Sequence, residues 1–302
     1  MIVTRLLKNI SVQKNPPKNY EELIPIISPE ESISRHIYQT DKSHNVAPAL
    51  AENISKIKAL NPGWTYHLFD DNDIESFILE NYGSHILAYY KRIGKGYGAA
   101  KADFFRYLVI YRHGGVYLDI KSTITKPLSE VIRANDRYLL SYWNNLPGQG
   151  HDGYGHYPGL PDHIERGEII QWYIAASAGH PLLRKVILTM LYNIDHYNPY
   201  VNGIGWTGTV VTTGPVMYTK VIWDALNNNP KLYPVRWLDI IEDAGFKYSI
   251  FESNQGANPG NPNHTSFLSS DYRKNETPLI THNSCLVQTI NVKYLKFLCK
   301  TH

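Results

Sequence analysis

The chain has 302 residues, of which 43% are hydrophobic and 19% carry a charge. This balance is typical of a globular protein and excludes a largely disordered chain, which would contain fewer apolar residues. The net charge is +3 and the basic residues are scattered, whereas a nucleic-acid-binding protein concentrates them on one face, so we expect no nucleic-acid partner.

Strand and helix patterns alternate through the first third of the chain. Residues 1–31 show no sustained periodicity and predict an irregular or helical lead-in. The following runs predict, in order, a strand at 35–40, a helix at 48–60, a strand at 64–69, cap residues at 70–73 and a helix at 74–82. Because this order is typical of parallel sheets, we predict an α/β fold with a mostly parallel central sheet.

Residues 98–126 combine a helix, two glycines and a strand. Four apolar residues with helical spacing form a stripe that should pack on the sheet: Phe104, Tyr107, Leu108 and Tyr111. Asp103 and Arg106 lie off this stripe and three residues apart, so they share another face of the helix. Taken alone, such a pair is most often a surface ion pair.

The strand after this helix supplies a further carboxylate. Gly114 and Gly115 predict the end of the helix, and residues 116–120 are β-prone. Since side chains alternate along a strand, Asp119 and Lys121 should share one face near the carboxyl end, where open parallel sheets bind ligands. Together, Asp103, Arg106 and Asp119 form the candidate site.

The chemistry of this set fits a nucleotide sugar. Carboxylates accept hydrogen bonds from sugar hydroxyls, a guanidinium donates several, and a cation must offset the charge of a leaving diphosphate. Downstream, residues 144–168 and 253–264 predict long surface loops, and residues 182–192 and the Thr-Gly-Pro turn at 213–215 predict further helices. We see no domain boundary and expect a single domain over residues 1–302.

The segment KADFFRYLVIYRHGGVYLDIK resembles the DXD sugar-binding region of glycosyltransferase family 32, which includes yeast-type α-mannosyltransferases and is related to the clostridial glucosylating toxins. Four other segments carry further similarity: RHIYQT, NPGWTYHLFDD, AASAGHPLL and TGP. The resemblance implies a GT-A fold, which is Rossmann-like, and sugar transfer with retention of the anomeric configuration.

The resemblance also implies roles for individual residues. Asp103 and Arg106 would hold the donor sugar, and Asp119 would be the first aspartate of the DXD element, contacting sugar, ribose or metal. Tyr38 and Thr40 on the opening strand would contribute to nucleotide binding, although Tyr38 replaces a histidine of the family pattern and Asp41 a tryptophan.

The main departure from the family pattern is Lys121, which replaces the second DXD aspartate, normally the principal metal ligand. A lysine repels Mn²⁺ or Mg²⁺ but could neutralise the diphosphate directly, so catalysis could be independent of metal. Alternatively, Asp119 and a downstream histidine, with His282 the best candidate, could still hold a cation. The sequence leaves both arrangements open.

We therefore predict a retaining glycosyltransferase that moves a hexose or N-acetylhexosamine from a UDP- or GDP-sugar to a hydroxyl of a glycan, lipid or protein. Two alternatives are a catalytically inactive sugar- or nucleotide-binding homologue, which Lys121 would permit, and a glycoside hydrolase with two catalytic carboxylates. The sequence does not indicate an oligomeric state.

Two cysteines, Cys285 and Cys299, are too few for a disulfide framework, which favours a reducing compartment. No stretch approaches the roughly 18 uninterrupted apolar residues of a transmembrane helix, and the first residues lack an apolar segment of signal-peptide length. We expect a cytoplasmic protein without a transmembrane segment, with any membrane contact peripheral.

Overall fold

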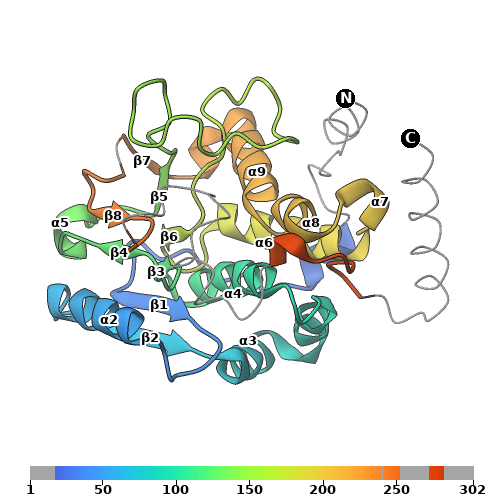
Figure 1. Cartoon of the computed structure of the whole chain (residues 1–302), viewed down its shortest axis with the longest axis horizontal. Coiled ribbons are helices and arrows are strands. Elements are labelled where there is room, and N and C mark those ends of the chain that lie inside the picture. Colours follow the sequence, from blue (N-terminus) through green and yellow to red (C-terminus); the bar gives the residue numbers. More distant parts are fainter. Residues whose placement is uncertain (1–17, 240, 252–271, 282–302) are drawn as a thin grey trace.

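The computed structural model describes residues 18–239, 241–251 and 272–281 (Figure 1). At its centre is a six-stranded sheet with the strand order β2-β1-β3-β6-β5-β7. Its strands are β1 His36–Thr40, β2 Thr65–Phe69, β3 Gly115–Leu118, β5 Tyr138–Ser141, β6 Tyr173–Ala176 and β7 Arg236–Leu238. A separate antiparallel pair joins β4 Thr123–Ile124 and β8 Phe246–Lys247.

Five of the six strands of the sheet run in one direction. Strands β2, β1 and β3 are parallel, β6 is antiparallel to both β3 and β5, and β7 is parallel to β5. The predicted α/β fold with a mostly parallel sheet is therefore confirmed. The carboxyl ends of all strands except β6 lie at one edge, which we call the carboxyl edge.

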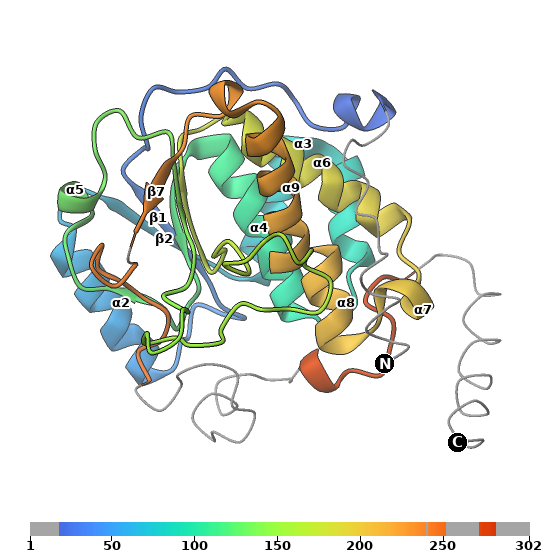
Figure 2. The ribbon, with the colours of Figure 1, turned by 90° about the horizontal axis from the view of Figure 1, so that it is seen from above.

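Helices cover both faces of the sheet (Figure 2). On one face lie α3 Asp71–Arg92, α4 Gly98–His113, α6 Pro181–Asp195 and α9 Pro215–Asn228, and on the other lie α2 Pro48–Leu60 and α5 Leu128–Val131. Two short helices, α7 Pro199–Asn202 and α8 Gly205–Thr212, and three 3-10 turns, Lys18–Glu22, Pro230–Leu232 and Tyr272–Lys274, complete the described elements. Within these residues, no helix combines the length and apolarity needed to cross a membrane.

The predicted boundaries of the first elements agree closely with the structure. Helix α2 spans the predicted residues 48–60, and Asp70 caps α3 by accepting hydrogen bonds from the backbone N–H groups of Asn72 and Asp73. Helix α3 continues past the predicted end at residue 82, although Gly83 interrupts it with a φ of 82°. The cap and breaker residues are local signals, which explains why the sequence predicts them well.

Helix α4 is buried on every side rather than along one stripe. The predicted stripe is buried, but so are Phe105, Val109 and Ile110 on the remaining surface. The reason is that α4 contacts α3 and α6 as well as strands β3 and β6, so it lies in a middle position between the sheet and other helices. Asp103 and Arg106 consequently lie inside the protein and not on its surface.

The two glycines between α4 and β3 are required by close backbone contacts. Gly114 has a φ of 65° and Gly115 a φ of 106°, which are backbone angles that residues other than glycine rarely adopt. A Cβ atom on Gly114 would lie 2.7 Å from the backbone nitrogen of Ala178, and one on Gly115 would lie 2.6 Å from the carbonyl oxygen of His36. This tight junction fixes the start of β3 and therefore the position of Asp119 after it.

Strand β3 ends at Leu118, earlier than the predicted end at residue 120. The chain then turns, because the N–H of Ser122 donates to the carbonyl oxygen of Asp119 at 2.8 Å. Lys121 lies in this turn, so the expectation that strand alternation places it on the same face as Asp119 is wrong.

The connection at 144–168 is an irregular surface loop, as predicted, but part of it packs against helices, which the prediction did not include. Leu160 and Ile164 are buried in an apolar cluster with Val210, Val211 and Val216 from α8 and α9. The apolar residues of this loop are too widely spaced to predict such packing. The second predicted loop, 253–264, and both cysteines lie outside the described residues.

Candidate active site

The structure brings Asp103, Arg106 and Asp119 together. Arg106 Nη2 donates to Asp119 Oδ1 at 2.8 Å and lies 3.4 Å from Asp103 Oδ1. Asp103 and Arg106 are on α4, and Asp119 directly follows β3 at the carboxyl edge. One guanidinium therefore joins two carboxylates across the junction of helix and sheet.

Arg106 is held on all sides by the protein. Its Nη1 donates to the carbonyl oxygen of Gln171 at 2.7 Å, and its Nε donates to that of Ala102 at 3.2 Å. Its guanidinium carbon lies 4.6 Å from the ring centroid of Tyr117. Because Arg106 is only 4% exposed, a ligand has little access to it.

Asp103 is equally enclosed, whereas Asp119 is not. Asp103 accepts hydrogen bonds from Thr213 Oγ1 at 2.9 Å and from Gln171 Nε2 at 3.3 Å, and it is 3% exposed. The side chain of Asp119 is 26% exposed. Asp119 is therefore the member of this group that can contact a ligand directly.

Burial and the neighbouring charges act in opposite directions on the pKa of Asp103 and on the pKa of Arg106. Burial raises the pKa of Asp103 to about 6, although the neighbouring Arg106 partly opposes this. Burial also works against the charge of Arg106, but the combined attraction of Asp119, Tyr117 and Asp103 outweighs it, and the pKa of the guanidinium is raised. Arg106 thus stays charged, and Asp103 takes up a proton at a higher pH than an ordinary aspartate does.

Lys121 is held beside this group by an aromatic residue. Its Nζ donates to the hydroxyl of Tyr248 at 2.7 Å and lies 4.0 Å from the centroid of the same ring. Burial lowers the pKa of Lys121 to about 8, and the carboxylate of Asp119 acts in the opposite direction. Lys121 therefore remains within electrostatic reach of Asp119, and both residues lie beyond the end of β3.

The remaining predicted site residues lie in different surroundings. Thr40 Oγ1 lies 3.2 Å from the hydroxyl of Tyr117, which in turn donates to Asp119 at 3.4 Å. Tyr38 is 3% exposed and its ring stacks on His67 at a centroid distance of 4.9 Å, so the structure places it in the core. The predicted metal ligand His282 lies outside the described residues.

Several buried residues around the site carry no signal in the sequence. Gln39 donates to the carbonyl oxygen of Asp119 at 3.0 Å and accepts from Tyr66, and thereby fixes the turn after β3. Gln171 and Thr213 hold Asp103 from segments far along the chain. The Thr-Gly-Pro sequence predicts only the start of α9.

Glu168 is a further buried carboxyl group close to the site. It is 4% exposed, accepts a hydrogen bond from Trp143 Nε1, and is also bonded by Tyr157. Burial raises the pKa of Glu168 to about 7, and the negative charge of Asp103 adds to this effect. It lies in the connection before β6, where the unusual length of the loop is the sole hint in the sequence.

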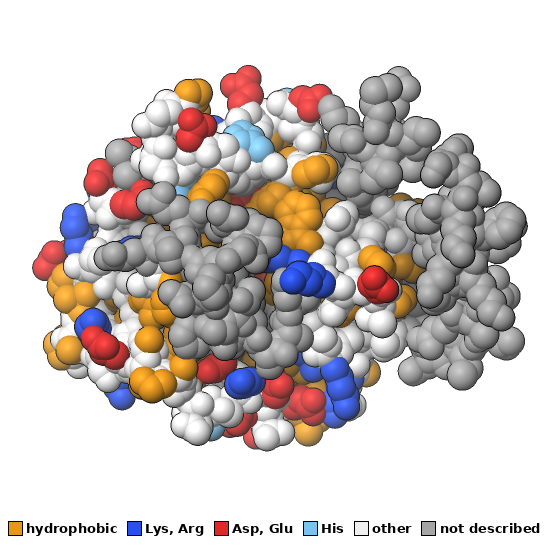
Figure 3. All heavy atoms as spheres, in the orientation of Figure 1, with side chains coloured by type: hydrophobic (Ala, Val, Ile, Leu, Met, Phe, Trp, Pro, Cys, Tyr) orange, Lys and Arg blue, Asp and Glu red, His pale blue; other side chains and the backbone are white. Residues whose placement is uncertain are grey.

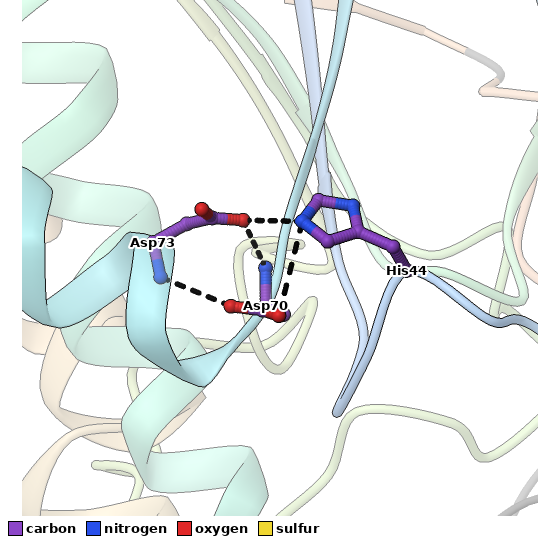
Figure 4. Close-up of side chains that lie close together, drawn as sticks. All are labelled: His44, Asp70 and Asp73. Atoms are coloured by element: carbon purple, nitrogen blue, oxygen red, sulfur yellow. Dashed lines mark hydrogen bonds and ion pairs between the residues drawn. The ribbon is translucent and has the colours of Figure 1, made fainter.

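One group of three potential metal ligands exists among the described residues, and it is separate from this site. His44 Nε2 lies 2.7 Å from Asp73 Oδ2 and 3.8 Å from Asp70 Oδ2 (Figure 4). Both carboxylates already form the capping box of α3, and the positive end of a helix dipole opposes a cation. We therefore interpret this group as a helix cap with an exposed ion pair.

The residues around Asp119 do not fit the divalent cation that the resemblance implies. Within the described ranges, Asp119 belongs to no group of three ligands close enough to share an ion. Its Oδ1 already accepts hydrogen bonds from Arg106 and Tyr117, and Lys121 adds a positive charge nearby. A cation at Asp119 would have to displace the hydrogen bonds from Arg106 and Tyr117, and the positive charge of Lys121 would repel it.

An open cavity of about 570 Å³ lies between β2 and α3 and shares no lining residue with the site. His67, Phe69, Phe77 and His113 are among its lining residues. On the face shown in Figure 3, acidic and basic side chains are interspersed. His44, Asp73 and Glu80 also line the cavity, so it adjoins the cap of α3 and not the candidate active site.

Comparison with known proteins connects the site to a protein family. Residues 48–139 match the family model described as glycosyltransferase sugar-binding region containing DXD motif. This range begins with α2, ends within β5, and includes Asp103, Arg106, Asp119 and Lys121.

Two relatives share parts of the sequence. The initiation-specific alpha-1,6-mannosyltransferase of Candida albicans is 28% identical over 202 residues, covering 60% of this chain and 50% of that protein. Inositol phosphoceramide mannosyltransferase 1 of Schizosaccharomyces pombe is 30% identical over 171 residues, covering 56% of this chain and 44% of that protein. The chain spans about half the length of the curated relatives it matches.

Two solved structures show a partial likeness to this one. The PaToxG glycosyltransferase has a TM-score of 0.47 and 16% identity, covering 76% of this chain and 82% of its own. The UDP-bound glycosyltransferase domain from the YGT toxin also has a TM-score of 0.47, with 8% identity, covering 74% of this chain and 82% of its own.

Proposed function

We propose that the chain transfers a sugar from a nucleotide sugar to an acceptor hydroxyl, because residues 48–139 match the glycosyltransferase sugar-binding region containing a DXD motif. The observation that carries the proposal is the contact of Arg106 with both Asp103 and Asp119 inside this region. Groups that cost free energy to bury and that adjoin a partly exposed carboxylate are typical of active sites.

The donor is a UDP- or GDP-sugar, with Asp119 accepting hydrogen bonds from the sugar or ribose hydroxyls. The sugar is a hexose or N-acetylhexosamine, and the relatives named as mannosyltransferases make mannose the first sugar to test. The acceptor is a hydroxyl of a glycan, lipid or protein. A cytoplasmic location and a single domain over residues 1–302 stay predictions.

In the proposed mechanism, Arg106 positions Asp119 and does not contact the diphosphate. All three nitrogens of Arg106 have protein partners, so it has little capacity left for a ligand. Lys121 remains as the cation that stabilises the negative charge on the leaving diphosphate. Transfer proceeds with retention, as the resemblance implies: the acceptor hydroxyl oxygen forms its bond to the anomeric carbon on the face from which the nucleotide diphosphate departs, and the departing diphosphate takes up the hydroxyl proton.

We further propose that this transfer does not require a divalent cation. The support is the poor fit of a cation to the residues around Asp119 and the presence of Lys121 there. The test is turnover in excess chelator. Loss of activity that Mn²⁺ or Mg²⁺ restores would favour the alternative, in which Asp119 and His282 hold a metal.

The decisive experiment measures thermal stabilisation by a panel of UDP- and GDP-sugars, followed by transfer assays with the donors that bind. We expect stabilisation by one class of donor and transfer from it. Donor binding without transfer or donor hydrolysis would instead indicate an inactive binding homologue. Release of sugar from plain glycosides without any nucleotide would indicate a hydrolase.

A further inference from the structure

A stack of Trp237, Tyr142 and Arg166, of which Trp237 is exposed and the other two are half-buried, lies near the carboxyl edge of the sheet; we call it the Trp237 stack. The rings of Tyr142 and Trp237 are nearly parallel, with an angle of 9° and a centroid distance of 4.8 Å. The guanidinium carbon of Arg166 lies 5.2 Å from the centroid of Tyr142. The side chains come from the residue after β5, from edge strand β7, and from the connection between β5 and β6.

The stack holds Trp237 rigidly without burying it. Trp237 is 36% exposed, and in the described part of the chain it belongs to none of the three apolar clusters. Arg166 is itself anchored, because its Nη2 donates to the carbonyl oxygen of Trp143 at 3.2 Å. An aromatic ring that is oriented by stacking and left open to solvent is a preformed contact surface.

The Trp237 stack lies on the same face and edge of the sheet as the candidate active site. Trp237 pairs with Leu140, whose side chain packs in the same apolar cluster as α4. Strands β5 and β7 run in the same direction as β3, so Tyr142 and Asp119 both follow strand ends at the carboxyl edge.

The connection between β5 and β6 links the Trp237 stack directly to the candidate active site. Arg166 lies in the stack, and five residues later Gln171 donates to Asp103 and accepts from Arg106. An extended chain covers at most about 3.5 Å per residue, so the Cα atoms of Arg166 and Gln171 are within roughly 17 Å of each other. A short oligosaccharide can bridge this distance.

We propose that the Trp237 stack binds a sugar ring of the acceptor, which makes the acceptor a saccharide. The flat ring of Trp237 would pack against the C–H face of a pyranose, as aromatic side chains with an apolar face and a polar edge do at interfaces. Asp239, which is exposed and follows Trp237 by two residues, offers a carboxylate to the sugar hydroxyls. This inference rests on the proposed function and narrows its acceptor.

The test compares Trp237→Ala with Leu232→Ala, which removes an exposed apolar side chain nearby in sequence. Binding of two probes, α-1,6-mannotriose and chitotriose, is measured by calorimetry. We expect Trp237→Ala to weaken binding of at least one probe by more than about tenfold. Leu232→Ala should leave it unchanged, and Trp237→Phe should restore part of it.

The proposal is overturned if neither probe binds the unaltered protein, or if Trp237→Ala binds both as tightly. It is also overturned if Trp237→Ala changes only the oligomeric state in solution, because the stack would then be a contact with a second copy of the chain. Stabilisation by nucleotide sugars is measured in parallel. Its absence in the unaltered protein would reject the proposed function, whereas normal stabilisation with unaffected saccharide binding rejects this inference alone.

Discussion

Two groups in this protein have nearly the same composition, two aspartates and a basic side chain, yet they differ in every other respect. Asp103, Arg106 and Asp119 lie at the junction of α4 and β3, and Asp103 and Arg106 are almost completely buried. His44, Asp70 and Asp73 lie at the start of α3, and the side chain of His44 is 58% exposed. Composition alone therefore does not distinguish a site from a helix cap.

The difference is what each carboxylate does for the fold. Asp70 and Asp73 satisfy backbone N–H groups that any helix leaves unpaired, and the exposed contact with His44 adds little. The buried group caps nothing, and its charges cost free energy to remove from water. A fold that retains such a group next to a partly exposed carboxylate is using it for something other than stability.

The largest effect is expected for Arg106→Met. Removing the guanidinium leaves Asp103 buried without its cation, so the free energy of unfolding should fall by about 3–5 kcal/mol. Urea unfolding measures this loss. The control is Arg112→Met on the same helix, an exposed arginine that donates to Asn81, which should change stability by less than about 1 kcal/mol. Equal losses in both variants would contradict the distinction between the two kinds of group.

Asp119→Asn separates catalysis from stability. We expect turnover to fall by roughly 10²–10³-fold, because an amide accepts hydrogen bonds from the donor hydroxyls more weakly than a carboxylate and offers only one acceptor oxygen. The melting temperature should fall only moderately, because the amide oxygen of the variant can still accept from Arg106 and the guanidinium keeps its contact with Asp103. Asp71→Asn, at an exposed position in the first turn of α3, is the matched control and should retain full activity. Near-normal transfer by Asp119→Asn would remove Asp119 from the site.

Glu168→Gln tests the buried carboxyl group through pH. The pKa of Glu168 is raised to about 7 from an ordinary value of 4.5, so between these values the unfolded chain releases its proton before the folded one. Folding stability should therefore fall by up to about 3 kcal/mol as pH rises through this window. The variant should lack this fall. Parallel stability curves for the two proteins would show that Glu168 ionises normally.

Asp70→Ala should have the smallest effect on the buried site. Loss of the helix cap should lower the free energy of unfolding by about 1 kcal/mol, and turnover should not change. His44→Ala removes only the exposed ion pair and should alter stability by less than about 0.5 kcal/mol. A large loss of activity in either variant would mean that this group is more than a cap.

The sequence determines the features that depend on neighbouring residues. The cap at Asp70, the helix at 48–60 and the break at Gly114 and Gly115 follow from local backbone geometry. The spacing of Asp103 and Arg106 and the position of Asp119 after a strand are equally local. For this reason the three central side chains of the site could be predicted before their contacts were seen.

Tertiary structure alone decided which residues enclose that site. Gln39, Thr213 and the neighbouring Glu168 and Gln171 approach it from three separate segments, and Lys121 lies in a turn beyond the strand end rather than on the strand. Helix α4 became buried on all sides because other helices pack over it. Contacts between distant segments depend on how whole elements pack, and no short stretch of sequence contains that information.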